Sequence, residues 1–174
     1  MSGSLLGVEL NDLRSAPVGY LEIYDMYPLD FKEFVRAAGL KNDVILMLED
    51  HFKKRNPVDD FIHSKMLDLF YLYLIVGGMP EAVLHFSANE DFNEVRNIQH
   101  RILAAYEQDF SKHAPNEIVP RIRMVWNSIP SQLAKENKKF LYGLVREGGR
   151  AKDYEAAIMW LSDSGLVPKV SRIN

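Results

Sequence analysis

The sequence has 174 residues, of which 21 are Lys or Arg and 24 are Asp or Glu, so its formal net charge is -3. Hydrophobic residues make up 47% and charged residues 26%, which is typical of a globular protein and not of a disordered one. It contains no cysteine, which excludes disulfides, thiolate metal sites and cysteine nucleophiles, and which favours a reducing, cytoplasmic location.

The first elements in chain order are a short strand and two helices. Alternation of apolar and polar residues predicts a strand over Val18–Tyr24. Asp30 and Glu33 have the spacing of a capping box, which predicts a helix that ends at Gly39. A second helix is predicted from Asp43 to Arg55, before Asn56-Pro57.

A buried helix is predicted over Asp60–Val76, because its apolar residues occur on all sides. Gly77-Gly78 end it, and Pro80 suits the first turn of a short helix through Phe86. Asp91 begins the next helix, whose apolar side chains recur on one face. That face comprises Phe92, Val95, Ile98, Ile102, Leu103, Tyr106 and Phe110.

Several short elements are predicted after Pro120. Ile122 to Trp126 begin one helix, and Pro130 starts a separate short helix through Asn137. Residues Lys139–Val145 are expected to be extended, and Gly148-Gly149 to turn the chain. A helix over Ala151–Ser164 is expected to pack on the one that contains Trp126, and Leu166–Ile173 to form a final strand.

Motifs for common chemistries are missing from the sequence. There is no G-x-x-x-x-G-K-[ST] loop to hold a triphosphate, no H-E-x-x-H metal site and no G-x-S-x-G nucleophile. We therefore assign no catalytic residue, no metal ligand and no cofactor to this chain. Its longest apolar run, Leu69–Val76, is too short for a membrane span, which needs about 20 residues.

Five segments together resemble the prokaryotic AAA-like ATPases that end in a conserved domain of unknown function. They are SGSLLGVEL near the start, PVGYLEIYDMYPLDFKEFVRAAG (Pro17–Gly39), YLIVGGMPEAV (Tyr73–Val83), RIRMVWNSIPSQLAKENKKF (Arg121–Phe140) and YEAAIMWLSDSGLV (Tyr154–Val167). The intact family binds ATP and magnesium through a P-loop and an acidic strand, both of which precede the segment where this chain begins. The resemblance implies that Ser2 or Ser4 matches the polar residue that senses the γ-phosphate, and that the chain is truncated at both ends.

The expected architecture is mainly α, with a helical bundle followed by a winged-helix-like module and a few short strands. Residues 1–29 would be the remnant of the ATPase sheet, residues 30–115 a lid-like bundle, and residues 116–174 an incomplete winged-helix-like module. The favoured function is that of a non-catalytic lid and C-terminal region of an AAA-like ATP-binding protein, acting in interaction or regulation. The unpaired edges of Val18–Tyr24 suggest a homodimer in which this strand adds to a second copy. A monomer with a frayed N-terminus is the alternative.

A second function is suggested by the uneven charge. From Arg121 onward there are ten Lys and Arg against five Asp and Glu, whereas residues 1–120 carry eleven against nineteen. A helix pair followed by a strand is the order of a winged helix, so this region is the candidate for weak, non-specific DNA binding. The candidate residues are Arg146, Arg150, Lys152, Lys169 and Arg172. An unrecognised hydrolase is the third and least supported hypothesis, since no nucleophile and base are suitably spaced.

Overall fold

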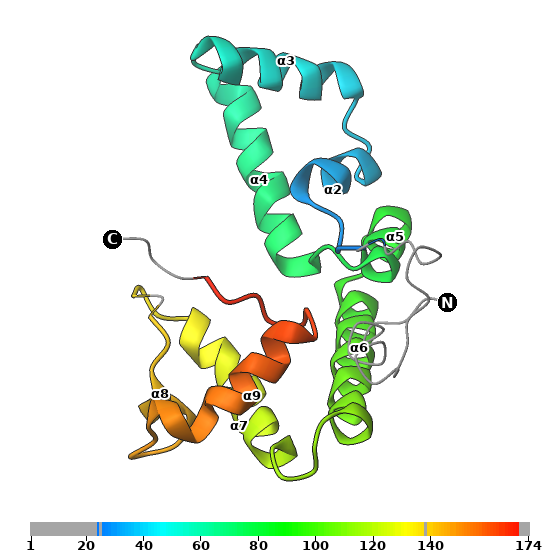
Figure 1. The fold of residues 1–174 in the computed structure, drawn as a ribbon. Helices are drawn as coiled ribbons and strands as arrows, with labels where there is room; N and C mark the ends of the chain where they lie inside the picture. The colour runs from blue at the N-terminus through cyan, green and yellow to red at the C-terminus, as the bar shows by residue number, and fades with distance from the viewer. Residues whose placement is uncertain (1–23, 25, 138, 171–174) are drawn as a thin grey trace, which may run out of the picture. The chain divides into compact units, whose positions relative to one another are not determined.

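A computed structural model describes residues 24, 26–137 and 139–170. These residues form eight α-helices and no strand, which confirms the mainly helical fold class (Figure 1). The described chain divides into two units, residues 24–103 and residues 104–170, which we call the N-terminal and C-terminal units. Neither contains a helix long and apolar enough to cross a membrane, within the part of the chain that the structure describes.

The N-terminal unit contains four complete helices and half of a fifth, and α2 begins and ends at local signals in the sequence. They are α2 (Phe31–Ala37), α3 (Asn42–Lys54), α4 (Asp60–Val76), α5 (Pro80–Asn89) and the first half of α6 (Phe92–His113). The predicted capping box is confirmed, because the Asp30 carboxylate accepts the backbone N–H of Glu33 and the Glu33 carboxylate accepts that of Asp30. Gly39 follows α2 with a positive φ of 87°, as expected for a residue that stops a helix.

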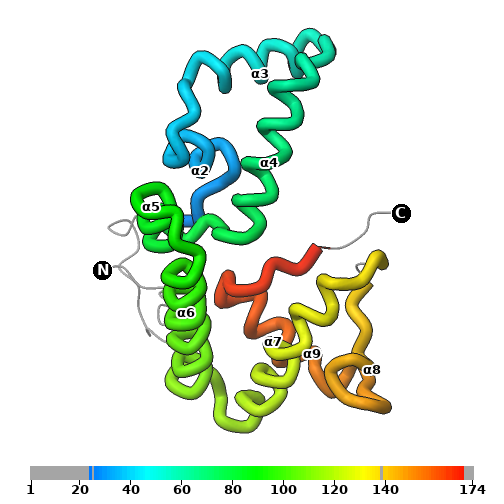
Figure 2. The backbone as a smooth tube through the Cα atoms, turned by 180° about the vertical axis from the view of Figure 1, so that it is seen from behind, coloured from blue at the N-terminus to red at the C-terminus, as the bar shows by residue number. Residues whose placement is uncertain are grey.

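The core of the N-terminal unit lies where α2, α4 and α5 meet. In both Figure 1 and Figure 2, α2 and α5 lie on the same side of α4. Phe34 is fully buried there, with Tyr73 of α4 and Phe86 of α5 against its ring. The Tyr73 hydroxyl donates to the backbone carbonyl of Leu29 at 2.9 Å. This bond holds the segment that precedes α2 against α4.

The helix α4 has the predicted bounds, but the prediction that it is buried is wrong. Leu69 and Val76 face the core, whereas other large apolar side chains on the helix face solvent. The periodicity could not select one face, because both faces of α4 are apolar. Only the positions of α2 and α5 decide which face is covered.

The C-terminal unit is built around α7 (Val119–Leu133) and α9 (Ala151–Asp163), with the single turn of α8 (Tyr142–Val145) beside α7. The prediction that α9 packs on the helix of Trp126 is confirmed, since Ile122, Val125 and Leu161 share one buried core. The Phe110 ring, from the second half of α6, is also fully buried there.

The separate helix predicted to start at Pro130 is wrong, because α7 runs through this residue to Leu133. Proline lacks an N–H and removes one helical hydrogen bond, but it does not prevent one more turn. The carbonyl of Pro130 accepts the backbone N–H of Ala134, and the Ser128 hydroxyl donates to the Val125 carbonyl at 2.7 Å. These bonds keep the end of α7 regular.

The strands expected of a winged-helix-like module are not seen in residues 104–137 and 139–170, so that part of the prediction is corrected. Residues 142–145 form α8 instead of an extended segment. After α9, Gly165 has a φ of 74° and the backbone N–H of Val167 donates to the Leu161 carbonyl at 3.1 Å. Leu166 and Val167 pack on the core, so their apolar side chains cover the end of a helix and do not form a sheet edge. Most of Val18–Tyr24 lies outside the described residues, and Tyr24 itself is not in a strand.

Candidate functional site

Five large apolar side chains form an exposed row along α4, which we call the α4 stripe. Their exposed fractions are about two fifths for Leu67 and Phe70, 60% for Tyr71, 63% for Leu74 and 57% for Ile75. The spacing of i, i+3, i+4, i+7 and i+8 places all five on one face of a helix. Such a face is normally buried, so this contiguous exposed one is the candidate interaction surface of the N-terminal unit.

The opposite face and the C-terminal end of α4 are held by the rest of the N-terminal unit. Leu69 and Val76 are buried in the core, and Leu72 packs against it. Beyond the helix, Gly77 is the C-cap, and the Gln99 side chain of α6 donates to the carbonyls of Ile75 and Val76 at 2.8 and 3.1 Å. The α4 stripe is therefore presented by an anchored helix.

The α4 stripe carries almost no charge. Asp68 is the only residue between Met66 and Met79 that carries a formal charge at neutral pH. Asp68 is about 100° around the helix from Leu67, at the edge of the stripe. The surface can therefore bind an apolar partner without burying an unpaired charge.

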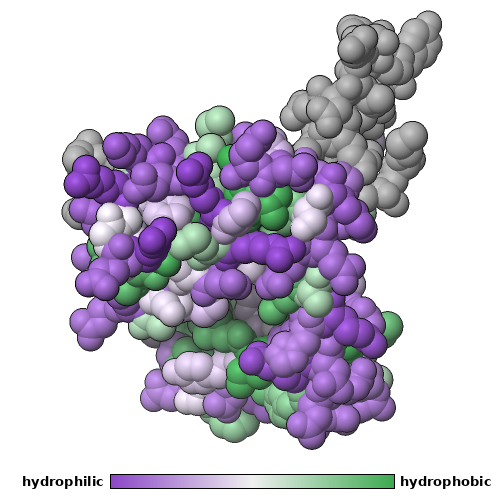
Figure 3. All heavy atoms as spheres, turned by 90° about the horizontal axis from the view of Figure 1, so that it is seen from below, coloured by the Kyte–Doolittle hydropathy of each residue, from purple (hydrophilic) through white to green (hydrophobic). Residues whose placement is uncertain are grey.

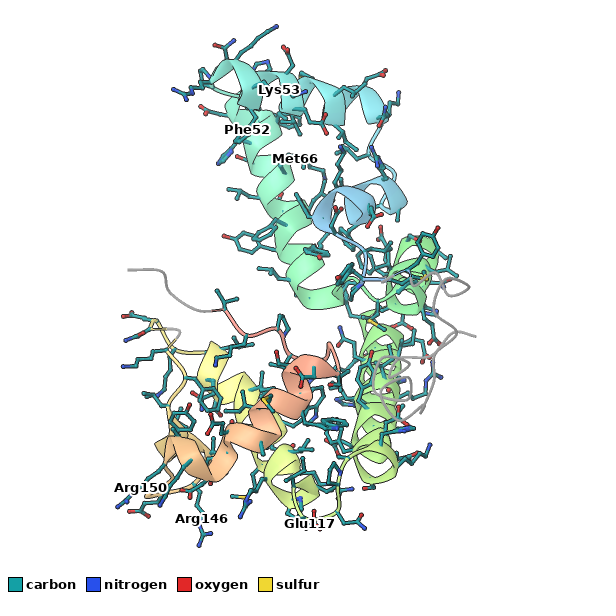
Figure 4. The ribbon with its side chains drawn as sticks, in the orientation of Figure 1. Phe52, Lys53, Met66, Glu117, Arg146 and Arg150 are labelled. Carbon is teal, nitrogen blue, oxygen red and sulfur yellow. The ribbon has the colours of Figure 1, made fainter. Side chains whose placement is uncertain are left out.

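Two further phenylalanines are exposed near the turn between α3 and α4, namely Phe52 and Phe61. Figure 4 shows Phe52 and Lys53 at the end of α3 that adjoins this turn. Their neighbour Lys54 forms an ion pair with Asp50 at 2.8 Å, and it lowers the pKa of the Asp50 carboxyl through that hydrogen bond and through its charge. Apolar side chains also reach the surface in several places on the face drawn in Figure 3.

The predicted basic residues are brought together only in part. Arg146, Arg150 and Lys152 are exposed around the start of α9, and Figure 4 shows Arg146 and Arg150 extending outward there. Arg146 lines a shallow depression with Arg121, but Glu147 and Asp153 line it as well. Acids among the bases weaken the attraction for phosphates.

The other predicted site residues do not join this group. Lys169 comes two residues after Val167, which is bonded to the C-terminal end of α9, and a helix of this length separates its ends by about 20 Å. Arg172 and the two serines suggested by resemblance, Ser2 and Ser4, lie outside the described residues.

The Gly148-Gly149 pair forms the turn that was predicted. Gly148 has a φ of 73°, and a Cβ atom at Gly149 would lie 2.9 Å from the carbonyl oxygens of Arg146 and Tyr142. The Asp153 carboxylate accepts the backbone N–H of Arg150 at 2.9 Å. A side chain of this protein thus already caps the start of α9, where an anion would otherwise be favoured.

Catalytic and metal-binding arrangements are not evident in the described residues. No group of three or more His, Asp or Glu side chains is placed to hold a metal ion among residues 24, 26–137 and 139–170. The two carboxyls with clearly lowered pKa values, Glu49 and Asp50, are exposed partners of lysines on the surface. The α4 stripe remains the most distinctive surface of the described chain.

Sequence reasoning missed the α4 stripe, although the sequence contained a signal for it. A helix with apolar residues all round has either two covered faces or one covered and one exposed face. We took the first alternative, and the structure has the second.

Comparison with known proteins gives one match. A family model described as a domain of unknown function (DUF8612) matches residues 67–174, which begin at the first residue of the α4 stripe. No curated protein and no solved structure matches the chain.

Proposed function

The chain belongs to the DUF8612 family, and we propose that it is a non-catalytic interaction part of an AAA-like ATP-binding protein. The observation that carries the interaction role is the α4 stripe, an anchored and nearly uncharged apolar helix face at the surface. Helix faces of this kind bind partner helices or grooves through side chains at i, i+3, i+4 and i+7. The connection to AAA-like ATPases rests on the resemblance of the sequence segments.

Two of the segments that resemble the AAA-like ATPases contain residues with structural roles, which supports the proposal that this chain is a non-catalytic part of such a protein. In YLIVGGMPEAV, Gly78 lies directly against the backbone of Leu29. In the segment from Arg121 to Phe140, the Gln132 amide forms two hydrogen bonds with the backbone of Leu141. Gly78 and Gln132 thus each have a structural role in internal packing and hydrogen bonding.

Photo-crosslinking in cells of the source organism tests the interaction role. A benzophenone amino acid at position 71 places the reactive group in the α4 stripe, and the same group at Leu84 provides a control. Leu84 is an exposed leucine of α5 outside the stripe, at 71% exposure. We expect a crosslinked protein product from position 71 and none from position 84. Equal labelling at both positions, or no product at position 71, would overturn the proposed function.

A second candidate function is weak, non-specific binding of DNA by the C-terminal unit. It is supported by the group of Arg146, Arg150 and Lys152 around the start of α9, with Arg121 nearby. Binding of this kind falls steeply with salt, because cations condensed on the phosphates are released. Titration of a DNA duplex at low and high salt tests it. An affinity that is independent of salt, or that survives replacement of Arg146 and Arg150 by alanine, would exclude these residues as the site.

A further inference from the structure

We propose that the partner of the α4 stripe is a second copy of this chain, bound antiparallel through α4 about a two-fold axis. This inference rests on the interaction role proposed above and adds the identity of the partner. It differs from the strand-mediated dimer suggested by Val18–Tyr24, because it uses described residues of a helix.

The exposed area of the α4 stripe is sufficient for a specific pair. Each of its five side chains has about half of its surface exposed. Large apolar side chains of this kind bury roughly 100 Å² each when such a half is covered, or about 500 Å² per copy. Two copies would bury about 1,000 Å², which is the lower limit for a specific interface. The expected dimer is therefore weak, and forms at micromolar concentrations or above.

The spacing of the stripe makes it complementary to itself in the antiparallel direction. With the two-fold axis between positions 70 and 71, Leu67 of one copy faces Leu74 of the other, and Phe70 faces Tyr71. Each of these contacts occurs twice, once on either side of the axis, as an isologous interface requires, and each joins two apolar side chains. Tyrosine is also enriched at interface centres, where its ring is buried and its hydroxyl reaches the rim.

The charge pattern favours a second copy over a charged partner. In a two-fold pair every charge near the axis meets its own image, so like charges at the centre would oppose association. The central positions 69–76 contain no charged residue, and Asp68 is at the edge of the stripe. A strongly acidic or basic partner would find no matching charge on this face.

The anchoring of α4 reduces the cost of binding. Leu69 and Val76 are fixed in the core, and Gln99 holds the last carbonyls of the helix. The backbone of the stripe is thus ordered before association, so backbone ordering is not added to the translational, rotational and side-chain freedom that binding removes.

The oligomeric state of the purified full chain tests the proposal. Sedimentation velocity over a range from low to high micromolar concentration should show a monomer–dimer equilibrium. Leu74→Glu places an unpaired carboxylate opposite Leu67 and should leave only monomer, with an unchanged far-ultraviolet circular dichroism spectrum. Leu84→Glu, which introduces the same charge on an exposed leucine outside the stripe, should leave the equilibrium unchanged.

Opposite charges introduced at positions 67 and 74 test the antiparallel register. Leu67→Lys alone should also give monomer, whereas a mixture of the Leu67→Lys and Leu74→Glu chains should form a one-to-one dimer, because the introduced amine faces the introduced carboxylate. A mixture that stays monomeric would overturn this register.

The alternatives give distinct results. A dimer that persists in Leu74→Glu would overturn the proposal and assign association to another surface, such as Val18–Tyr24. A chain that is monomeric at all concentrations would overturn it as well. Neither result would affect the interaction role itself, which fails only if position 71 gives no specific crosslinked product in cells.

Discussion

Leu29 and Gly78 are joined backbone to backbone, although they are far apart in the sequence. The N–H of Leu29 donates to the carbonyl of Gly78 at 2.7 Å, and a Cβ atom at Gly78 would lie 2.2 Å from the carbonyl oxygen of Leu29. The same Leu29 carbonyl accepts the hydroxyl of Tyr73. Glycine at position 78 is therefore required by close approach of the chain that enters α2.

Gly78→Ala should destabilise the N-terminal unit by about 1–3 kcal/mol or more, because the backbone of Leu29 must move to admit the methyl group. Urea unfolding followed by circular dichroism measures this, and faster hydrogen exchange at the Leu29 amide would locate the change. The control is Gly143→Ala in α8, where a Cβ atom has nothing within 4 Å. That variant should be neutral or slightly stabilised. A Gly78→Ala chain as stable as the native one would contradict the proposed close contact.

Gln132→Ala should destabilise the C-terminal unit by about 1–3 kcal/mol. The Gln132 amide donates to the Leu141 carbonyl at 2.8 Å and accepts the Leu141 N–H at 3.0 Å, so it closes the loop between α7 and α8. Both tryptophans lie in the C-terminal unit, so their fluorescence reports its unfolding.

Two variants separate hydrogen bonding from volume at this position. Gln132→Glu keeps the size of the side chain but loses the donor to the Leu141 carbonyl, so it should also be destabilised. If it is as stable as the native chain, packing and not hydrogen bonding explains the effect of Gln132→Ala. Asn127→Ala, at an exposed position of α7, should change stability by less than about 0.5 kcal/mol.

Leu161→Ala should cost about 2–5 kcal/mol of stability in the C-terminal unit, because this side chain is 1% exposed in the core between α7 and α9. Tryptophan fluorescence during urea unfolding gives the value. Met159, which is exposed two residues earlier on α9, is the comparison. Met159→Ala should have almost no effect, and similar losses in both variants would mean that α9 does not pack as described.

The ion pair of Lys32 and Glu49 should make a small contribution to stability that depends on pH. Lys32 of α2 forms a hydrogen bond and ion pair with Glu49 of α3, which lowers the pKa of Glu49 below its ordinary value of 4.5. A carboxyl with a lowered pKa in the folded state stabilises it above the ordinary pKa, and this contribution is lost as the pH falls through the lowered value.

Comparison of Lys32→Ala with the native chain measures this contribution. The native chain should be slightly more stable at neutral pH, and the difference should shrink as the pH falls through the lowered pKa of Glu49 and vanish once that carboxyl is protonated. Lys65→Ala, an exposed lysine of the same unit, should not show this dependence. A difference that is unchanged from neutral to acid pH would show that the ion pair does not contribute.

Calorimetry with Mg-ATP should show no micromolar binding to this chain alone. The sequence has no phosphate-binding loop with its lysine, and this loop supplies most of the contacts to a triphosphate in P-loop proteins. Binding in the micromolar range would contradict a non-catalytic role and require a nucleotide site of another kind.

Local signals in the sequence placed most of the helices. The bounds of α4 were predicted without error and those of α2, α3 and α9 to within a residue or two, because caps, glycines and prolines act on a few neighbouring residues. The basic residues of the C-terminal unit were likewise found as a group by counting charge. Whether they lie together depends on the turn at Gly148-Gly149 and on the length of α9, which separates Lys169 from Arg150.

The sequence by itself thus determined that the described part of the chain is mainly helical and where α2, α3, α4 and α9 begin and end, since these are properties of short segments. Only the tertiary structure decided which face of α4 is covered. Because apolar residues occur on all sides of this helix, the periodicity of the sequence does not distinguish the buried face from the exposed one. Only the tertiary structure decided that Leu166 and Val167 pack over the end of α9. A strand needs a neighbouring strand as its hydrogen-bond partner, whereas here the N–H of Val167 donates to the carbonyl of Leu161 in α9 itself.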